Sequence, residues 1–234
     1  MGPVLIILAI VSVMIFVAWY VWYLEKQRRE ALRQLAQELG LSYTAADSHG
    51  YPSRFQHLNG YNSGHSRNAY NILSGEYRKH AVVALHYLYK TTETYIYSKG
   101  HVRTRTVTHQ FSSVVLELAA RFPAEVFVRP EGFLDRLAGW VGFDDIDFES
   151  DEFSRKFYVK STDRRLAYDI FHPRMMEYLL KTPPYQIELD QSNVHFRRGD
   201  RFTPAEFREA LDRAIDFVAL FPDYLVQQLS AAAR

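Results

Sequence analysis

The chain opens with an uninterrupted apolar run. Its first 24 residues carry no charged side chain, and the stretch from Val4 to Leu24 is built almost entirely from aliphatic and aromatic residues. At about 1.5 Å per helical residue, some 20 residues cover the roughly 30 Å hydrocarbon core of a bilayer. The run predicts a transmembrane anchor over residues 1–24. A cleaved signal peptide fits less well, because no basic segment precedes the run and bulky aromatic residues stand where small residues precede a cleavage site.

Aromatic and then basic residues close this run. Tryptophan and tyrosine rings favour the headgroup level of a membrane, and lysine and arginine are enriched on its cytoplasmic side. The sequence therefore predicts a membrane interface, with the lipid bilayer as partner, at Trp19, Tyr20, Trp22, Tyr23, Lys26, Arg28 and Arg29. Because the N-terminal flank offers only the α-amino group, the same rule predicts an N-out, C-in topology with the body in the cytoplasm.

The body begins with a helical pattern. Leu32, Leu35, Ala36 and Leu39 recur at helical spacing with charged residues opposite, and Gly40 stands where a helix ends. A juxtamembrane helix is expected over residues 25–40, followed by a loop with a short strand up to residue 64.

β-Branched and aromatic residues dominate residues 70–118, which predicts three or four antiparallel strands with turns at Ser74-Gly75 and at residues 98–101. Apolar residues occupy both faces of residues 82–89, so this strand is expected to be central and covered on both sides. The polar and cationic alternation over residues 103–108 predicts an edge strand.

The second half mixes short strands and helices. Strands are expected over residues 124–129 and 153–160, with a hairpin of residues 185–189 and 194–197, and helices over residues 133–140, 163–171 and 173–180. Thr203, Pro204 and Glu206 supply an N-cap, an N1 proline and a capping-box glutamate, so an amphipathic helix begins there and continues through Val218.

Strands outnumber helices and pair mostly as hairpins, which indicates the α+β class. The expected architecture is an N-terminal transmembrane helix followed by a mostly antiparallel-sheet soluble domain with flanking helices. The soluble domain covers residues 41–234, and its division into two subdomains meeting near residues 121–145 is an alternative.

The amino-acid composition argues against several classes of function. The 28 lysine and arginine residues balance 27 acidic ones. A general nucleic-acid binder is therefore not expected, because its affinity rests on a basic excess. The absence of cysteine excludes disulfides, thiolate metal sites and a thiol nucleophile.

Motifs for catalysis and metal binding are missing from the sequence. The acidic segment 144–152 fails as a calcium loop starting at Asp145, because position six is Ser150 and position twelve is Lys156. Ile146 and Phe148 are expected to point inward from this segment. The nine histidines lack zincin spacing, and neither a nucleophile elbow nor a phosphate loop is present. We therefore expect no catalytic residue, no cofactor and no metal site.

Several short segments resemble an uncharacterised family of bacterial single-pass membrane-anchored proteins, a domain of unknown function. The segments that carry the resemblance are residues 40–43, 71–77, 87–89, 126–131, 146–149 and 153–159. The resemblance extends over nearly the whole chain, and it implies no activity, ligand or catalytic residue.

The sequence favours a membrane-anchored, non-catalytic binding or scaffolding protein with an unknown ligand and a protein partner at the membrane. An enzyme of unrecognised type is the alternative, with an acid–base or metal site at Asp145, Asp147 and Glu149, or at His57 and His65. A structural envelope protein is a third hypothesis. The sequence does not indicate an oligomeric state.

Overall fold

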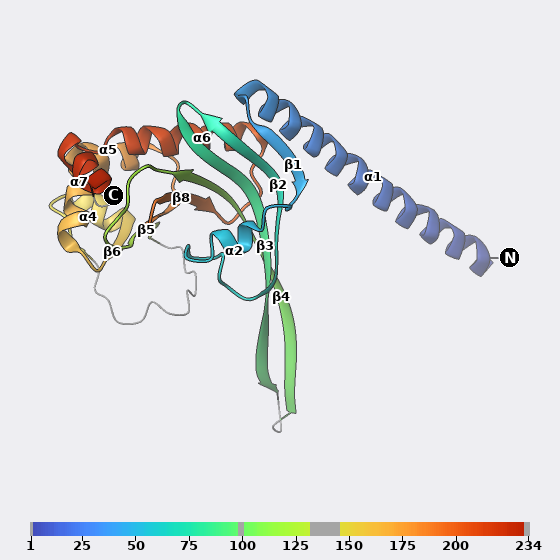
Figure 1. Ribbon diagram of the computed structural model, residues 1–234. Coiled ribbons are helices and arrows are strands. Elements are labelled where there is room, and N and C mark those ends of the chain that lie inside the picture. The colour runs from blue at the N-terminus through green and yellow to red at the C-terminus, as the bar shows by residue number, and fades with distance from the viewer. Residues whose placement is uncertain (1, 98–100, 132–145, 232–234) are drawn as a thin grey trace.

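The computed structural model describes residues 2–97, 101–131 and 146–231 (Figure 1). A long N-terminal helix leads into a body in which one sheet carries helices on both faces. The helices are α1 (Gly2–Leu39), α2 (Tyr51–Arg54), α3 (Asp151–Lys156), α4 (Arg164–Ile170), α5 (Pro173–Lys181), α6 (Pro204–Ala219) and α7 (Asp223–Ala231). This arrangement confirms the α+β class predicted from the sequence.

The sheet has eight strands in the order β1-β2-β3-β4-β8-β7-β5-β6, and neighbouring strands are antiparallel. The strands are β1 (Ser42–Ala46), β2 (His65–Tyr77), β3 (His80–Tyr97), β4 (His101–Glu117), β5 (Val126–Pro130), β6 (Phe157–Ser161), β7 (Gln186–Asp190) and β8 (Asn193–Arg198). Pairing of β4 with β8 joins the two halves of the sequence into one continuous sheet.

Two hydrophobic cores lie on opposite faces of this sheet. The larger core packs the C-terminal part of α1 and helices α3 to α7 against one face. The smaller core packs α2 and the segment after it against β2, β3 and β4 on the other face. Alternate residues of β3 enter the two cores, with Val82 and Ala84 in the larger and Val83, Leu85 and Tyr87 in the smaller. The predicted central strand is confirmed.

The C-terminal part of α1 belongs to the larger core. Leu32, Leu35, Ala36 and Leu39 of α1 are buried in it, as their spacing predicts. Gly40 follows with a φ of +70°, a left-handed conformation that glycine adopts without strain and that ends the helix. No loop separates the apolar N-terminal part of α1 from its buried C-terminal part, because α1 is one helix of 38 residues.

The predicted helix caps are also observed. At the start of α6, the Thr203 side chain accepts a hydrogen bond from the Glu206 backbone, and the Glu206 side chain accepts one from the Thr203 backbone. Helices α4 and α5 and the β7–β8 hairpin agree with their predictions within a few residues.

Several local predictions are wrong. Ser74-Gly75 lies inside β2, and the turn to β3 is formed by Arg78 and Lys79, both with positive φ. Residues 153–156 belong to α3 instead of a strand, because the Ser150 side chain accepts a hydrogen bond from the Phe153 backbone and caps this helix. Helices α2 and α7 were not expected.

The predicted edge strand is confirmed: residues 103–108 of β4 pair with β3 alone. Residues 112–117 of the same strand pair with both β3 and β8. The predicted helix over residues 133–140, Asp145 and most of the turn at 98–101 lie outside the described residues.

Candidate functional site

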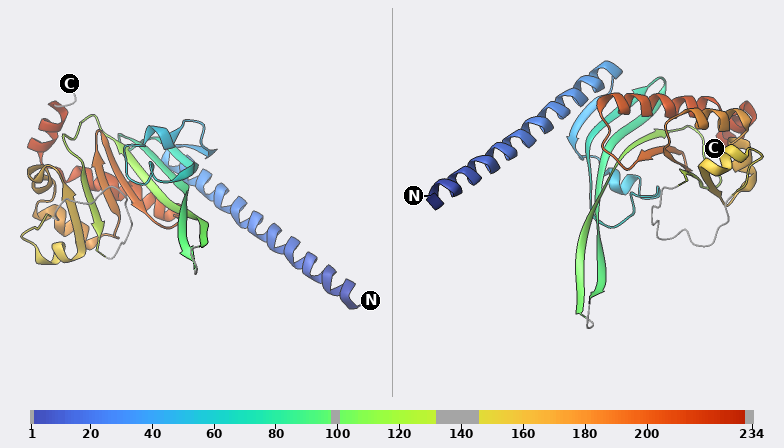
Figure 2. Two further views of the ribbon diagram at one scale, coloured as in Figure 1. Left: turned by 90° about the horizontal axis from the view of Figure 1, so that it is seen from below. Right: turned by 180° about the vertical axis from the view of Figure 1, so that it is seen from behind.

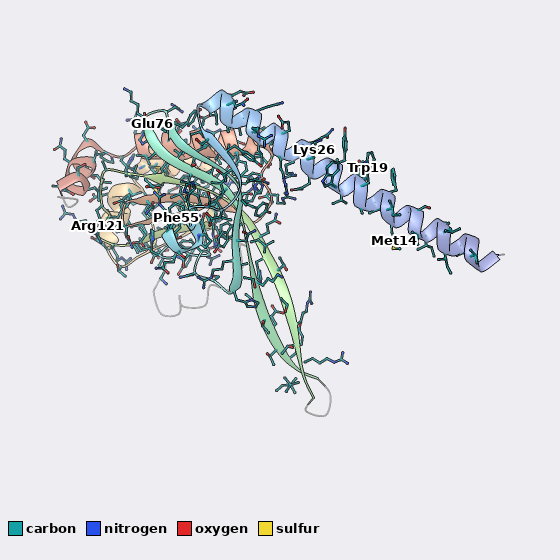
Figure 3. All side chains as sticks on the ribbon, turned by 45° about the vertical axis from the view of Figure 1, so that its right-hand side comes forward. Met14, Trp19, Lys26, Phe55, Glu76 and Arg121 are labelled. Carbon is teal, nitrogen blue, oxygen red and sulfur yellow. The ribbon has the colours of Figure 1, made fainter. Side chains whose placement is uncertain are left out.

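The N-terminal part of α1 is an uncovered apolar helix. Its described side chains from Val4 to Leu24 are all exposed, and Figure 3 shows Met14 and Trp19 projecting from a helix that leaves the body behind. Among the described residues, α1 is the one helix long and apolar enough to cross a membrane. A bilayer removes this apolar surface from water, so the helix is suited to be a membrane anchor. A signal sequence would have similar composition, but α1 continues unbroken into the core.

Four predicted interface residues form an aromatic collar around α1. Trp19, Tyr20, Trp22 and Tyr23 are all exposed. The rings of Trp19 and Tyr23 stack at a centroid distance of 5.6 Å, and the Lys26 ammonium lies 5.4 Å from the Trp22 ring. The collar thus presents rings and positive charge together at one level of the helix, which is the chemistry that headgroups accept.

Arg28 is used differently from the other predicted basic residues. It is half-buried, and its guanidinium donates a hydrogen bond of 3.4 Å to the Phe202 carbonyl of the body. Glu25, one turn earlier on the same face, forms an ion pair with Arg201. At the far end of α1, Glu38 pairs with Arg208 of α6. The contacts of Arg28 and Glu25 fasten the helix to the body just beyond the collar, and the Glu38 pair fastens its far end.

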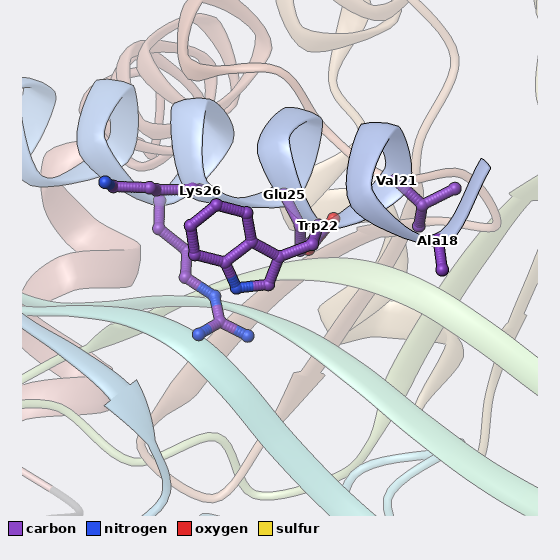
Figure 4. Close-up of a pocket in the computed structure, with 6 residues that line it drawn as sticks. Ala18, Val21, Trp22, Glu25 and Lys26 are labelled. Carbon is purple, nitrogen blue, oxygen red and sulfur yellow. The ribbon is translucent and has the colours of Figure 1, made fainter. Parts of the chain in front are cut away.

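A pocket of about 500 Å³ lies where α1 leaves the body (Figure 4). In Figure 4 the Trp22 ring and the Lys26 side chain lie next to each other along the helix. The lining of the pocket combines apolar and charged side chains of this one helix, namely Ala18, Val21, Trp22, Glu25, Lys26 and Arg29. Such a lining matches the boundary between acyl chains and headgroups.

A second group of candidate side chains lies on the sheet face covered by α2. Glu188 of β7 and His195 of β8 stand opposite each other in register, and each is only 1% exposed. The Asn59 backbone N–H donates to both Glu188 carboxylate oxygens at 2.9 Å. The Asn59 side chain donates to Glu125 at 2.9 Å and to Glu188 at 3.0 Å. We call Asn59, Glu125, Glu188 and His195 the buried polar cluster; Glu188 and His195 are buried, and Asn59 and Glu125 at its edge are half-buried.

Burial perturbs the titration of this cluster. It raises the pKa of Glu125 to about 8, with the neighbouring Glu188 carboxylate adding to the shift. Burial also raises the pKa of Glu188 to about 7, against the Asn59 hydrogen bond and the Arg197 charge. Each carboxyl group affects the other, so the two titrate as a pair, above the ordinary range for carboxyl groups. Burial and then the Arg197 charge hold the pKa of His195 well below its ordinary range, so the ring is neutral.

The buried polar cluster is closed by tight packing. Gly60 has a φ of +91°, and a Cβ at this position would overlap the Arg197 guanidinium. Next to it, the Tyr61 hydroxyl donates to Ser113 at 2.8 Å. The His195 Nδ1 lies 3.5 Å from Glu188, beyond good hydrogen-bond distance. Among the described residues, no group of three or more His, Asp or Glu side chains could hold a metal ion. The arrangement therefore fastens the segment after α2 to the sheet.

The acid–base residues suggested by the sequence are not assembled into a site. Asp147 and Glu149 are exposed, while Ile146 and Phe148 between them are buried as predicted. His57 contacts the Asn193 side chain at 3.0 Å. His65, in contrast, contacts Ser66 and Thr92 at the base of the long β3–β4 hairpin. Asp145 lies outside the described residues.

Sequence reasoning missed the buried polar cluster. Gln186, Glu188 and Asp190 alternate with Ile187 and Leu189, a pattern that ordinarily marks the solvent face of a strand. The signal available was the pairing of two such strands in one hairpin, because His195 and Arg197 follow the same alternation on β8.

Comparison with known proteins yields one structural likeness. No family model and no curated protein matches the chain, which agrees with its resemblance to an uncharacterised family. Among solved structures, the chain is similar to the mycobacterial trehalose monomycolate transport factor A, TtfA. The TM-score is 0.56 at 14% sequence identity, and the match covers 83% of this chain and 96% of that chain. At this identity the likeness shows the fold.

Proposed function

We propose that this chain is a single-pass membrane-anchored, non-catalytic protein that holds a folded domain against the membrane to bind or scaffold a protein partner there. The observation that carries the proposal is the dual role of α1. Its exposed N-terminal part has the length of a span, and its C-terminal part is core. The domain therefore moves with its anchor.

Rigid attachment is what a positioning protein requires. A flexible linker would let the domain adopt many heights and orientations above the membrane. Binding a partner would then cost conformational entropy, which would weaken the affinity. Here the Glu25–Arg201 pair and the Arg28 hydrogen bond to Phe202 fix the helix at the point where it leaves the body. A surface of the domain is thereby held in one orientation toward other membrane proteins.

The non-catalytic part of the proposal rests on the separation of the acid–base residues named from the sequence: Asp147 and Glu149 are exposed, whereas His57 and His65 contact different strands. In the second group, Glu188 is buried, and both Glu188 and Glu125 accept hydrogen bonds from Asn59. The protein with the similar structure is a transport factor. A comparable accessory role in a membrane process is an analogy of fold, since one fold serves many functions.

The proposal includes a topology. We assign residues 1–24 to the span, 25–40 to the juxtamembrane helix and 41–234 to a cytoplasmic domain, with N-out, C-in orientation. The collar residues Trp19, Tyr20, Trp22 and Tyr23, with Lys26 and Arg29, would lie at the cytoplasmic headgroup level. The burial of Leu32 and Ala36 supports treating residues 25–40 as part of the folded domain.

Orientation is tested by single-cysteine labelling, which the cysteine-free chain makes clean. Glu76→Cys, at an exposed position of β2, should resist a membrane-impermeant maleimide in intact cells and react after permeabilisation. Labelling in intact cells would place the domain outside and overturn the assigned orientation.

The positioning role is tested by breaking the helix without disturbing the core. Gln27 is exposed in α1 between the collar and Leu32, so Gln27→Pro should interrupt the helix while Gln27→Ala preserves it. Photo-crosslinkers at Tyr168 and Tyr224, both exposed on the body, should capture one stoichiometric protein in the Ala variant and at least several-fold less in the Pro variant. Equal capture in both variants would refute rigid positioning, and no stoichiometric capture in either would refute partner binding.

A further inference from the structure

The β3–β4 hairpin extends well beyond the sheet. β2 last pairs with β3 at Lys90, and β8 pairs with β4 only from Ser112 onward. Beyond these points β3 and β4 pair with each other through seven further rungs, from Thr91–Val107 to Tyr97–His101. At about 3.3 Å per residue this extension is roughly 20 Å long. We call residues 91–97 and 101–107 the ribbon.

The outer part of the ribbon exposes apolar side chains. Ile96 and Val102 stand directly opposite each other and are 80% and 63% exposed. Outside α1, these two are the most exposed large hydrophobic side chains of the described residues. Tyr95, next to Ile96, is also exposed. An isolated two-stranded ribbon is only marginally stable in water, and exposed apolar side chains at its end would be stabilised by an apolar environment.

The ribbon points toward the side of the body on which the anchor lies. In Figure 1 it runs downward from the sheet, while the N-terminal part of α1 runs downward and away from the same sheet. The view from behind in Figure 2 shows the same relation. When the apolar part of α1 crosses a bilayer, the end of the ribbon therefore approaches the leaflet from which α1 emerges.

Charge on the ribbon suits that leaflet. Arg103 and Arg105 are exposed, with Arg103 opposite Tyr95 and Arg105 opposite Glu93. Rings beside cations are also the composition of the collar on α1. Anionic headgroups attract such residues, each contributing about fivefold to local binding near the surface.

From the exposed apolar pair, the flanking arginines and the shared direction with α1, we propose that the end of the ribbon is a second membrane contact. Ile96 and Val102 enter the boundary between headgroups and acyl chains, and Arg103 and Arg105 bind anionic headgroups. This inference rests on α1 being the anchor, and it adds a second fixed point, so that the domain cannot tilt or rotate freely about the helix.

The test uses the full-length protein in vesicles of phosphatidylcholine and phosphatidylglycerol. Single cysteines at Ile96, at Val226 on the exposed face of α7 and at Val17 in the apolar part of α1 carry an environment-sensitive fluorophore. We expect lipid-borne quenchers to act on the probes at positions 96 and 17 and to leave the probe at 226 unaffected. Arg103→Gln with Arg105→Gln should weaken quenching at position 96 and remove its dependence on phosphatidylglycerol.

The outcomes separate the two proposals. Quenching at position 17 without quenching at 96 would overturn the ribbon contact and leave the anchor intact. Quenching at neither would overturn the anchor itself. Protection of position 96 in cells, but not in vesicles, would assign the ribbon to a protein partner and also overturn the lipid contact. The Val102→Asp variant, with the probe still at position 96, should lose quenching without a change in circular dichroism, because this exposed residue supports no core.

Discussion

Removing one buried leucine from α1 tests whether the anchor and the domain are one folded unit. Leu32 is fully buried in the larger core, although it lies only eight residues beyond the last residue of the predicted span. Leu→Ala changes in such sites cost about 2.7–5 kcal/mol, through lost burial and the cavity left behind. Whole domains are stable by only about 5–15 kcal/mol, so Leu32→Ala should remove a large part of the stability.

The expected effect is measurable on the full-length protein in micelles. A loss of about 3 kcal/mol should lower the midpoint of thermal unfolding by roughly 6–12 °C for a domain of this size, followed by circular dichroism in the β-sheet region. Leu24→Ala is the matched control, because Leu24 belongs to the same helix and is exposed. If Leu32→Ala unfolds at the same temperature as this control, α1 is not packed on the body, and the argument for rigid positioning is refuted.

Three further predictions concern titration and backbone conformation. Because the pKa of Glu125 is raised to about 8 from 4.5, the native state keeps a proton that the unfolded chain releases, and stability should fall as pH rises from about 4.5 to 8. In Glu125→Gln, the midpoint of urea unfolding should depend less on pH over this range. Burial lowers the pKa of His86 to about 3 from 6.5, so stability should fall as pH drops below 6.5; His86→Leu should abolish about 2 kcal/mol of that loss at pH 5. Gly64→Ala should lower the thermal midpoint strongly, because φ is +58° and a Cβ would overlap the Lys90 carbonyl, whereas Gly199→Ala should be tolerated.

Local sequence signals predicted the elements that carry their own caps. Thr203, Pro204 and Glu206 start α6 by contacts within four residues, so no tertiary information is needed. The β2–β3 turn was missed because Arg78 and Lys79 adopt positive φ without the glycine or asparagine that usually marks such a turn. In α3, the alternation of apolar residues suggested a strand, and the Ser150 cap decided the outcome.

The candidate sites also differ in whether they depend on residues close together in the sequence. The anchor and its aromatic collar depend on residues adjacent in sequence, and these were predictable. The buried polar cluster joins Asn59, Glu125 and the β7–β8 hairpin residues Glu188 and His195, which come from three distant segments, so the fold of the sheet brings them together. The ribbon was visible as a polar strand pair, but its projection from the sheet follows from where β2 and β8 end.

The distribution of polar and apolar side chains indicates which surface of the domain a protein partner would bind. Burying the Glu188 carboxyl is costly, and the Asn59 hydrogen bonds that offset this cost occupy both of its oxygens. In the arrangement we propose, the exposed apolar side chains of α1 and of the ribbon contact the membrane and are not available to a protein partner. Large exposed side chains outside these two regions occur on α4 and α7, at the end of the body far from the N-terminus of α1 (Figure 1). Tyr168 and Tyr224 on these helices are therefore the first positions at which substitution should weaken partner binding while membrane anchoring persists.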